Sequence, residues 1–121
     1  MSNAAVTVTV PGQPVSKQRP RFNTTTGRAA TPQVTKAAEA RVGWALREAF
    51  PTVNRRSEFK VSLWFYSKDR RRRDIDNLTK LCLDAANGIV WQDDSQVVEL
   101  HAWHVRGCLE PLTRILVEVV A

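Results

Sequence analysis

The sequence predicts a small α+β domain, in which helices pack on a mixed β-sheet in the order β-α-β-α-β-β. Three observations predict it: segments with alternating apolar residues, two segments with apolar residues at three- and four-residue intervals, and their order along the chain. A chain of 121 residues with 43% apolar content is long enough for one core and too short for two. We therefore expect residues 1–121 to form a single domain, with 1–4 as a possible tag remnant.

The N-terminal half is predicted to hold a strand, a long loop and a helix. Valine and threonine alternate over residues 5–10, and Pro11-Gly12 ends this strand in a turn. Residues 13–32 mix prolines and basic residues with little apolar periodicity, which indicates a basic surface loop. A loop of this length is either functional or merely solvated. Residues 35–50 carry apolar side chains at helical intervals, and Pro51 ends the helix.

The C-terminal half is predicted to hold three strands and a second helix. Residues 58–66 alternate between apolar and other side chains, as a long strand does. Apolar residues then recur at helical intervals over residues 77–88, and a glycine ends this short amphipathic helix. The last two strands, at about 96–105 and 114–120, are expected to form a hairpin through residues 107–111.

Charge and cysteine content limit the classes of partner and compartment. The 18 basic residues, 13 of them arginine, exceed the 12 acidic ones and give a net charge of +6, which favours a polyanionic partner. No apolar stretch is long enough to span a bilayer. Cys82 and Cys108 have no metal-ligand spacing, so a reduced, cytoplasmic protein is expected, with a disulfide between them as the alternative.

One acidic and basic motif points to chemistry. The cations Arg70–Arg73 directly precede Asp74 and Asp76, which point to the same side if the backbone is extended there. Asp94 follows a turn, so the three carboxylates can converge if the two strands are neighbours. Such a cluster needs a counterion, and oxygen ligands favour Mg²⁺, with Mn²⁺ plausible. Lys80, four residues after Asp76, can neutralise charge on a scissile phosphate.

Each part of this motif also has an ordinary structural explanation. Asp74 or Asp76 can cap the second helix, and Asp76 with Lys80 can be a simple ion pair. Asp93 and Asp94 can belong to a polar turn. The arginine run can be a solvated charge cluster. The chemical interpretation therefore depends on the parts being brought together.

Histidine and tryptophan are assigned mainly structural roles. His101 and His104 fall on opposite faces of one strand, so they cannot bind one metal ion together. The four tryptophans are interpreted as core residues more readily than as base-stacking platforms: Trp44, Trp64, Trp91 and Trp103.

The chain resembles the RusA family of Holliday-junction resolvases. The residues that carry the resemblance are Asp69 to Leu78, Lys80, Asp84-Ala85 and Trp91 to Val98, and in the basic loop Gly12 to Arg21 with Thr31-Pro32. The D-x-D-N-x-x-K element together with W-x-D-D-x-Q-V is specific, whereas the last two strands are generic. One departure is Ala86, where the family often has a larger aliphatic residue, which affects packing more than chemistry.

The resemblance implies a RusA-like fold and a homodimeric, Mg²⁺-dependent endonuclease that binds four-way DNA junctions and nicks two strands symmetrically. It also implies roles for residues at matching positions. Asp74, Asp76 and Asp94 would be catalytic metal ligands, Lys80 a catalytic lysine and Asp93 an accessory. The candidate DNA contacts are Lys17, Arg19, Arg21, Arg70, Arg71, Arg72 and Arg73, with Arg73 nearest the reacting phosphate.

Two other functions fit the same residues. In a noncatalytic DNA-binding accessory protein, the aspartates would cap and orient a basic surface. A flap nuclease or an RNase would use the same metal-dependent chemistry on another substrate. Dimerisation has its own rationale, because a four-way junction is approximately two-fold symmetric and two sites related by a dyad can cut opposing strands.

Overall fold

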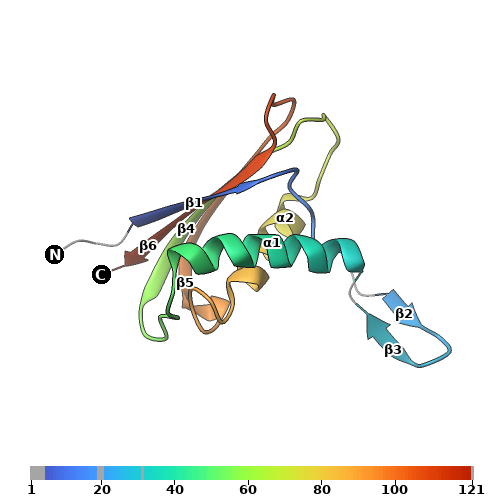
Figure 1. The fold of residues 1–121 in the computed structure, drawn as a ribbon, viewed down its shortest axis with the longest axis horizontal. Helices are drawn as coiled ribbons and strands as arrows, with labels where there is room; N and C mark the ends of the chain where they lie inside the picture. Colours follow the sequence, from blue (N-terminus) through green and yellow to red (C-terminus); the bar gives the residue numbers. More distant parts are fainter. Residues whose placement is uncertain (1–4, 19–20, 31, 121) are drawn as a thin grey trace.

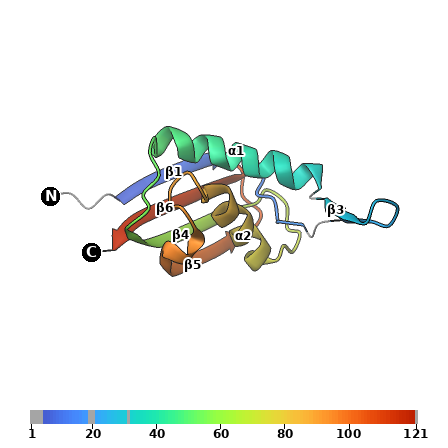
Figure 2. The same cartoon turned by 90° about the horizontal axis from the view of Figure 1, so that it is seen from below.

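Two helices cover one face of a four-stranded mixed sheet (Figures 1 and 2). The structure is a computed structural model and describes residues 5–18, 21–30 and 32–120. Its elements are β1 (Ala5–Pro11), β2 (Arg21–Asn23), β3 (Arg28–Ala30), α1 (Gln33–Ala49), β4 (Glu58–Tyr66), α2 (Ile75–Ala86), the short 3-10 helix η1 (Asp94–Gln96), β5 (Val97–Val105) and β6 (Leu112–Val120). The predicted α+β class is confirmed; the possible tag remnant, residues 1–4, lies outside the described residues.

The strand order of the main sheet is β1-β6-β4-β5, with β4 parallel to β5 and every other neighbouring pair antiparallel. The predicted hairpin of the last two strands is therefore wrong, because β4 lies between them. The connection at 106–111 instead passes the end of β4, where the Ser67 amide donates to the Val105 carbonyl at 2.8 Å. Strand β4 lies at the centre of the sheet, where its helix-facing side chains, from Phe59 to Phe65, are all buried and those on the other face are mostly half-buried.

The core lies between the sheet and the helices. From β4, Phe59, Val61, Leu63 and Phe65 are all 2% exposed or less. Side chains at helical spacing meet them from α1 and α2, among them Leu46 and Leu78. Burial of each large aliphatic side chain contributes about 1.5–3 kcal/mol. This packing fixes α2 on the sheet and thereby sets the position of its first turn.

The basic loop at 13–32 contains a structure that periodicity did not predict. Strands β2 and β3 pair antiparallel as a small hairpin that projects away from the main sheet (Figure 1). Each strand has three residues, which is too short for an alternating pattern to be recognised. Gly27, with φ of +70°, supplies the turn residue that such a tight hairpin needs.

The tryptophans divide between core and surface. Trp91 is 1% exposed, as expected of a core residue, but Trp44 is 70% and Trp103 is 45% exposed. The expectation of a core role is therefore wrong for those two. Trp103 stacks on Trp64, with ring centroids 5.0 Å apart, on the sheet face opposite the helices.

Both cysteines are free, so the alternative of a disulfide is excluded. Burial of Cys82 against the core raises the pKa of its thiol to about 12. Cys108 is partly exposed, and its amide donates to the Ser67 carbonyl at 2.9 Å. Among the described helices, none has the length and apolar character needed to cross a membrane.

Candidate active site

The first turn of α2 presents two aspartates. Asp74 is the N-cap residue, and its carboxylate accepts the Asp76 amide at 2.9 Å and the Asn77 side-chain amide at 3.3 Å. Both Asp74 and Asp76 are exposed. The capping interpretation of Asp74 is therefore confirmed. Capping leaves room for a further ligand, because a carboxylate has about four acceptor positions and Asp74 uses two of them here.

The arginine run forms an ordered loop between β4 and α2. Arg73 donates to both carboxylate oxygens of Asp69, at 2.6 and 3.1 Å, and the Arg71 amide donates to the same carboxylate at 3.2 Å. These bonds, Arg73 foremost, lower the pKa of Asp69 to about 2. Arg70, Arg71 and Arg72 remain exposed. The loop thus directs three guanidiniums to solvent beside Asp74, while Arg73 is held by Asp69.

Asp94 begins η1, just before β5. The carboxylate of Asp93 caps this turn by accepting the Ser95 amide at 3.0 Å. Gln96 then ties the turn to the start of β4, since its side-chain amide donates to the carbonyls of Asn54 and Ser57, both at 2.9 Å. Asp94 therefore lies where β4 begins, whereas Asp74 follows the end of β4.

The prediction that Asp74, Asp76 and Asp94 converge within one chain is wrong. Strands β4 and β5 are neighbours as required, but they are parallel from Phe59 opposite Val97 to Tyr66 opposite Val105. The end of β4, which leads to Asp74, and the start of β5, which follows Asp94, therefore lie roughly 25 Å apart along the strands. Helix α2, which begins directly after Asp74, is about 18 Å long and ends beside Trp91, close to Asp94 in sequence. Within the described residues of one chain, no group of three His, Cys, Asp or Glu side chains could hold a metal ion.

The oxygen donors at the first turn of α2 suit a hard cation, although one chain supplies only part of a ligand set. Asp74 and Asp76 are exposed carboxylates of the kind that Mg²⁺ prefers. The extended backbone that would point both to the same side is absent, because α2 begins at Ile75 and Asp76 lies in its first turn. Lys80 is exposed one helical turn beyond Asp76. The predicted alternative of an ion pair between Asp76 and Lys80 is not formed among the described residues.

Lys17 has two carboxylate partners that the sequence did not reveal. Its ammonium lies between Glu39 on α1, at 2.9 Å, and Asp84 on α2, at 2.7 Å, and these bonds raise its pKa, that from Asp84 most. Its backbone amide donates to the Asn77 carbonyl at 2.9 Å. Lys17 therefore joins the basic loop to both helices, and its charge is already balanced by protein carboxylates.

Replacing Lys17 with methionine is expected to lower the free energy of unfolding by about 1–2 kcal/mol, between the values for exposed and buried ion pairs. The change leaves Glu39 and Asp84 facing each other without a cation. Urea unfolding followed by fluorescence measures the loss. The triple variant that adds Glu39→Gln and Asp84→Asn should recover part of it. A Lys17→Met protein with unchanged stability but weaker DNA affinity would instead make Lys17 a DNA contact.

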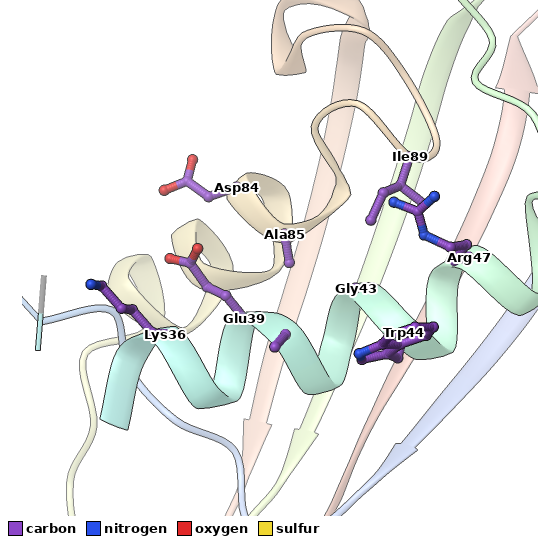
Figure 3. Close-up of a pocket in the computed structure, with 9 residues that line it drawn as sticks. Lys36, Glu39, Gly43, Trp44, Arg47, Asp84, Ala85 and Ile89 are labelled. Atoms are coloured by element: carbon purple, nitrogen blue, oxygen red, sulfur yellow. The ribbon is translucent and has the colours of Figure 1, made fainter. Parts of the chain in front are cut away.

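One cavity among the described residues lies away from the aspartates. It has a volume of about 560 Å³ and opens between α1 and α2, where Trp44 and Arg47 line it from α1 (Figure 3). Its acidic lining residues, Glu39 and Asp84, are those that Lys17 binds. None of Asp74, Asp76 and Asp94 lines this cavity, so it is a separate feature.

The remaining candidates are placed as follows. Arg19 lies outside the described residues, and Arg21 lies in β2 with its side chain outside the description. His101 and His104 do fall on opposite faces: His101 contacts Glu99 at 2.6 Å and His104 contacts the Ser67 hydroxyl at 2.8 Å. Partial burial, with the charges of nearby arginines, lowers the pKa of His104.

Sequence reasoning assigned no role to two residues beside the site, Asn77 and Arg106. Asn77 donates to Asp74, and Arg106 donates to the Arg70 carbonyl at 3.4 Å, so both support the first turn of α2 and the arginine loop. Asn77 belongs to the D-x-D-N motif and could have been assigned from it. Arg106 lies 36 residues from Arg70 and only the sheet brings them together.

Comparison with known proteins gives consistent results. The family model described as endodeoxyribonuclease RusA matches residues 11–119. The crossover junction endodeoxyribonuclease RusA of Escherichia coli strain K12 is 31% identical over 93 residues, which cover 76% of each chain. The protein of the same name from Shigella sonnei strain Ss046 is equally similar over the same length.

Proposed function

This chain belongs to the RusA endodeoxyribonuclease family and is accordingly a nuclease, and we propose that it is a Mg²⁺-dependent enzyme that resolves four-way DNA junctions by paired, symmetric nicks. The observation that carries the proposal is the first turn of α2. There the exposed carboxylates of Asp74 and Asp76 follow three solvent-facing arginines, with Arg73 between them. Cations that grip a sugar-phosphate strand thus lie beside donors for a hard metal ion.

In the proposed site, Asp74 and Asp76 would hold the metal ion together with Asp94, which lies too far away within one chain and would come from the second copy of a homodimer. When bound, Mg²⁺ would stabilise charge on the phosphoryl oxygen and lower the pKa of a bound water. The protein supplies the rest. Asn77 orients the Asp74 carboxylate through its side-chain amide. Lys80 places a positive charge one turn further along α2, where it offsets the charge on the scissile phosphate.

The arginine loop is proposed to bind the DNA backbone. Arg70, Arg71 and Arg72 are exposed, whereas the Asp69 carboxylate holds Arg73 in a bidentate contact. In this arrangement Asp69 fixes the shape of the loop and the free guanidiniums contact phosphates, which they do with forked hydrogen bonds. The prediction that Arg73 reaches the reacting phosphate then requires it to exchange Asp69 for the DNA.

Replacing both Arg71 and Arg72 with alanine is expected to weaken junction binding and to make its salt dependence shallower, by about 2 in the logarithmic slope if each contacts one phosphate. Fluorescence anisotropy with a labelled junction between 50 and 200 mM salt, roughly the range over which such contacts are lost, measures both quantities. The double variant Lys36→Ala, Arg47→Ala removes the same charge from α1 and serves as the control. Equal slopes in the two double variants would assign Arg71 and Arg72 to another role.

The substrate is tested by one preparation offered four nucleic acids: a four-way junction, a flap, a linear duplex and RNA. Paired nicks in the junction with Mg²⁺, lost in EDTA and supported by Mn²⁺, are the expected result. Preferential cleavage of the flap or of RNA would assign the same chemistry to another substrate. A protein that binds the junction and cleaves none of the four is the noncatalytic alternative, which the capping roles of Asp74 and Asp93 favour.

We further propose that the enzyme acts as a homodimer in the cytoplasm. The two-fold symmetry of the junction supports the dimer, because two dyad-related sites can cut opposing strands in one encounter. Two free thiols, Cys82 and Cys108, support a reducing compartment.

A further inference from the structure

The cavity between α1 and α2 is a groove with an apolar floor. Its volume of about 560 Å³ lies within the range of ligand-binding sites, roughly 300–1,000 Å³. Ala40 and Gly43 line it from α1, and Ala85 and Ile89 line it from α2 and the turn that follows. Gly43 allows this close arrangement, because a Cβ atom at its position would lie 3.3 Å from the Ile89 Cδ1 atom. Small side chains thus leave room for an apolar group between the helices.

The lining of the groove also includes an exposed tryptophan and two cations. Trp44 is 70% exposed, although its indole is the largest apolar side chain in the lining. Lys36 and Arg47 are exposed as well, and neither forms an ion pair within the part of the chain that the structure describes. They lie on the same face of α1, about three turns or 16 Å apart, toward opposite ends of the groove (Figure 3). The groove therefore offers an aromatic surface and two positive charges that are available to a ligand.

The carboxylates in the lining favour a peptide over a nucleic acid. Glu39 and Asp84 line the groove, and the Lys17 ammonium between them balances only part of their charge. A nucleic acid strand has a negative charge on every nucleotide, so these carboxylates would repel it. A peptide backbone instead has N–H donors, which the free acceptor positions of the two carboxylates can bind. A lining of both signs thus fits a chain with a few acidic side chains better than a uniform polyanion.

We propose that the groove between α1 and α2 binds a short acidic segment of another protein. The distance between the two cations corresponds to about five residues of extended peptide. A carboxylate near each end of the segment would pair with Lys36 and Arg47, and an apolar or aromatic side chain between them would lie on the floor beside Trp44. Tryptophan and arginine are the residues that most often contribute the binding energy of such contacts.

This inference goes beyond the proposed function and does not depend on it. None of Asp74, Asp76 and Asp94 lines the groove, and neither do the exposed arginines of the loop before α2. A bound segment therefore leaves the first turn of α2 and the arginine loop free. The groove would bring the enzyme to another protein without competing for the DNA.

Fluorescence anisotropy with labelled peptides tests the groove in the absence of DNA and metal. The probes are peptides of about five residues with an aspartate at each end and phenylalanine, tryptophan or leucine in the middle. The whole chain is expected to bind at least one of them saturably, and not the matching peptide with asparagine at both ends. The double variant Lys36→Ala, Arg47→Ala should weaken binding by about tenfold or more, because both charge-assisted contacts are lost.

Two further variants separate the groove from the overall charge. Trp44→Ala should weaken peptide binding by about tenfold, and Trp44→Phe should restore most of it, because an aromatic surface is regained. The double variant Arg71→Ala, Arg72→Ala removes the same charge from the arginine loop as the Lys36 and Arg47 changes remove from α1. It should bind the peptide as the wild type does.

The outcomes distinguish this proposal from the proposed function. Absence of saturable binding of every acidic peptide, or equal peptide affinities in the two double variants, would overturn the groove proposal. A single-stranded oligonucleotide that binds more tightly than the peptides, and is lost in the Trp44→Ala chain, would overturn it too and make the groove a nucleic-acid site. A chain that binds the peptide but nicks no substrate fails the proposed function alone. A chain that nicks the junction but binds no peptide fails only the groove proposal.

Discussion

An Asp76→Asn protein is expected to lose Mg²⁺-dependent nicking by about 10³-fold or more while still binding the four-way junction. Asparagine has nearly the shape of aspartate but lacks the negative charge that holds a cation. Asp76 is exposed in the first turn of α2, and it is its backbone amide that bonds to Asp74, so the fold should be unaffected. Junction affinity should be equal or higher, because a negative charge beside the phosphates is removed.

Single-turnover nicking of a labelled junction in Mg²⁺ measures the first effect, and anisotropy in Ca²⁺ measures binding. Glu48→Gln is a suitable control, because it neutralises an exposed carboxylate on α1, away from the first turn of α2. It should nick at the wild-type rate. Unchanged cleavage by the Asp76→Asn protein would remove Asp76 from the site and favour the capping explanation of the whole acidic turn.

A Trp91→Ala protein is expected to lose about 3–5 kcal/mol of unfolding free energy, which is a large part of the stability of a small domain. Trp91 is 1% exposed, packs against Phe59 with ring centroids 5.4 Å apart and donates its indole N–H to Asn87 at 2.9 Å. Its truncation leaves a cavity and an unpaired amide where α2 leads toward η1.

Urea unfolding of Trp91→Ala and Trp44→Ala, followed by circular dichroism, measures this effect. Trp44 is 70% exposed, so its replacement should change the unfolding free energy by less than about 0.5 kcal/mol. Similar losses in both proteins would show that the segment around Trp91 contributes less to the core than its burial indicates. A loss confined to Trp91→Ala would confirm that the core holds the segment around Trp91 in place.

Sequence reasoning succeeded where a local pattern determines structure. The alternation of residues 58–66 matches the bounds of β4, and the helical intervals locate α1 and α2 to within about two residues. The aspartates were placed correctly at the junction between strand and helix. These features depend on neighbours along the chain, and the sequence contains that information directly.

Pairing between distant segments was not predictable in the same way. The last two strands are close in sequence, which favours a hairpin, but the apolar, buried strand β4 pairs with both of them and lies between them. The same parallel pairing of β4 with β5 separates Asp94 from Asp74. The family resemblance implied that Lys17 contacts DNA, yet carboxylates 22 and 67 residues away bind it. Amino-acid composition cannot predict such contacts between distant segments.

The contrast between the two thiols has a practical consequence. The sulfur of Cys82 is sealed in the core with a pKa of about 12, so maleimide reagents at neutral pH should reach it only when the domain opens. Cys108 is accessible and sits at the root of the arginine loop through its bond to Ser67. A fluorophore attached to Cys108 would report the binding of a nucleic acid. The rate at which Cys82 is labelled would measure global unfolding in the same sample.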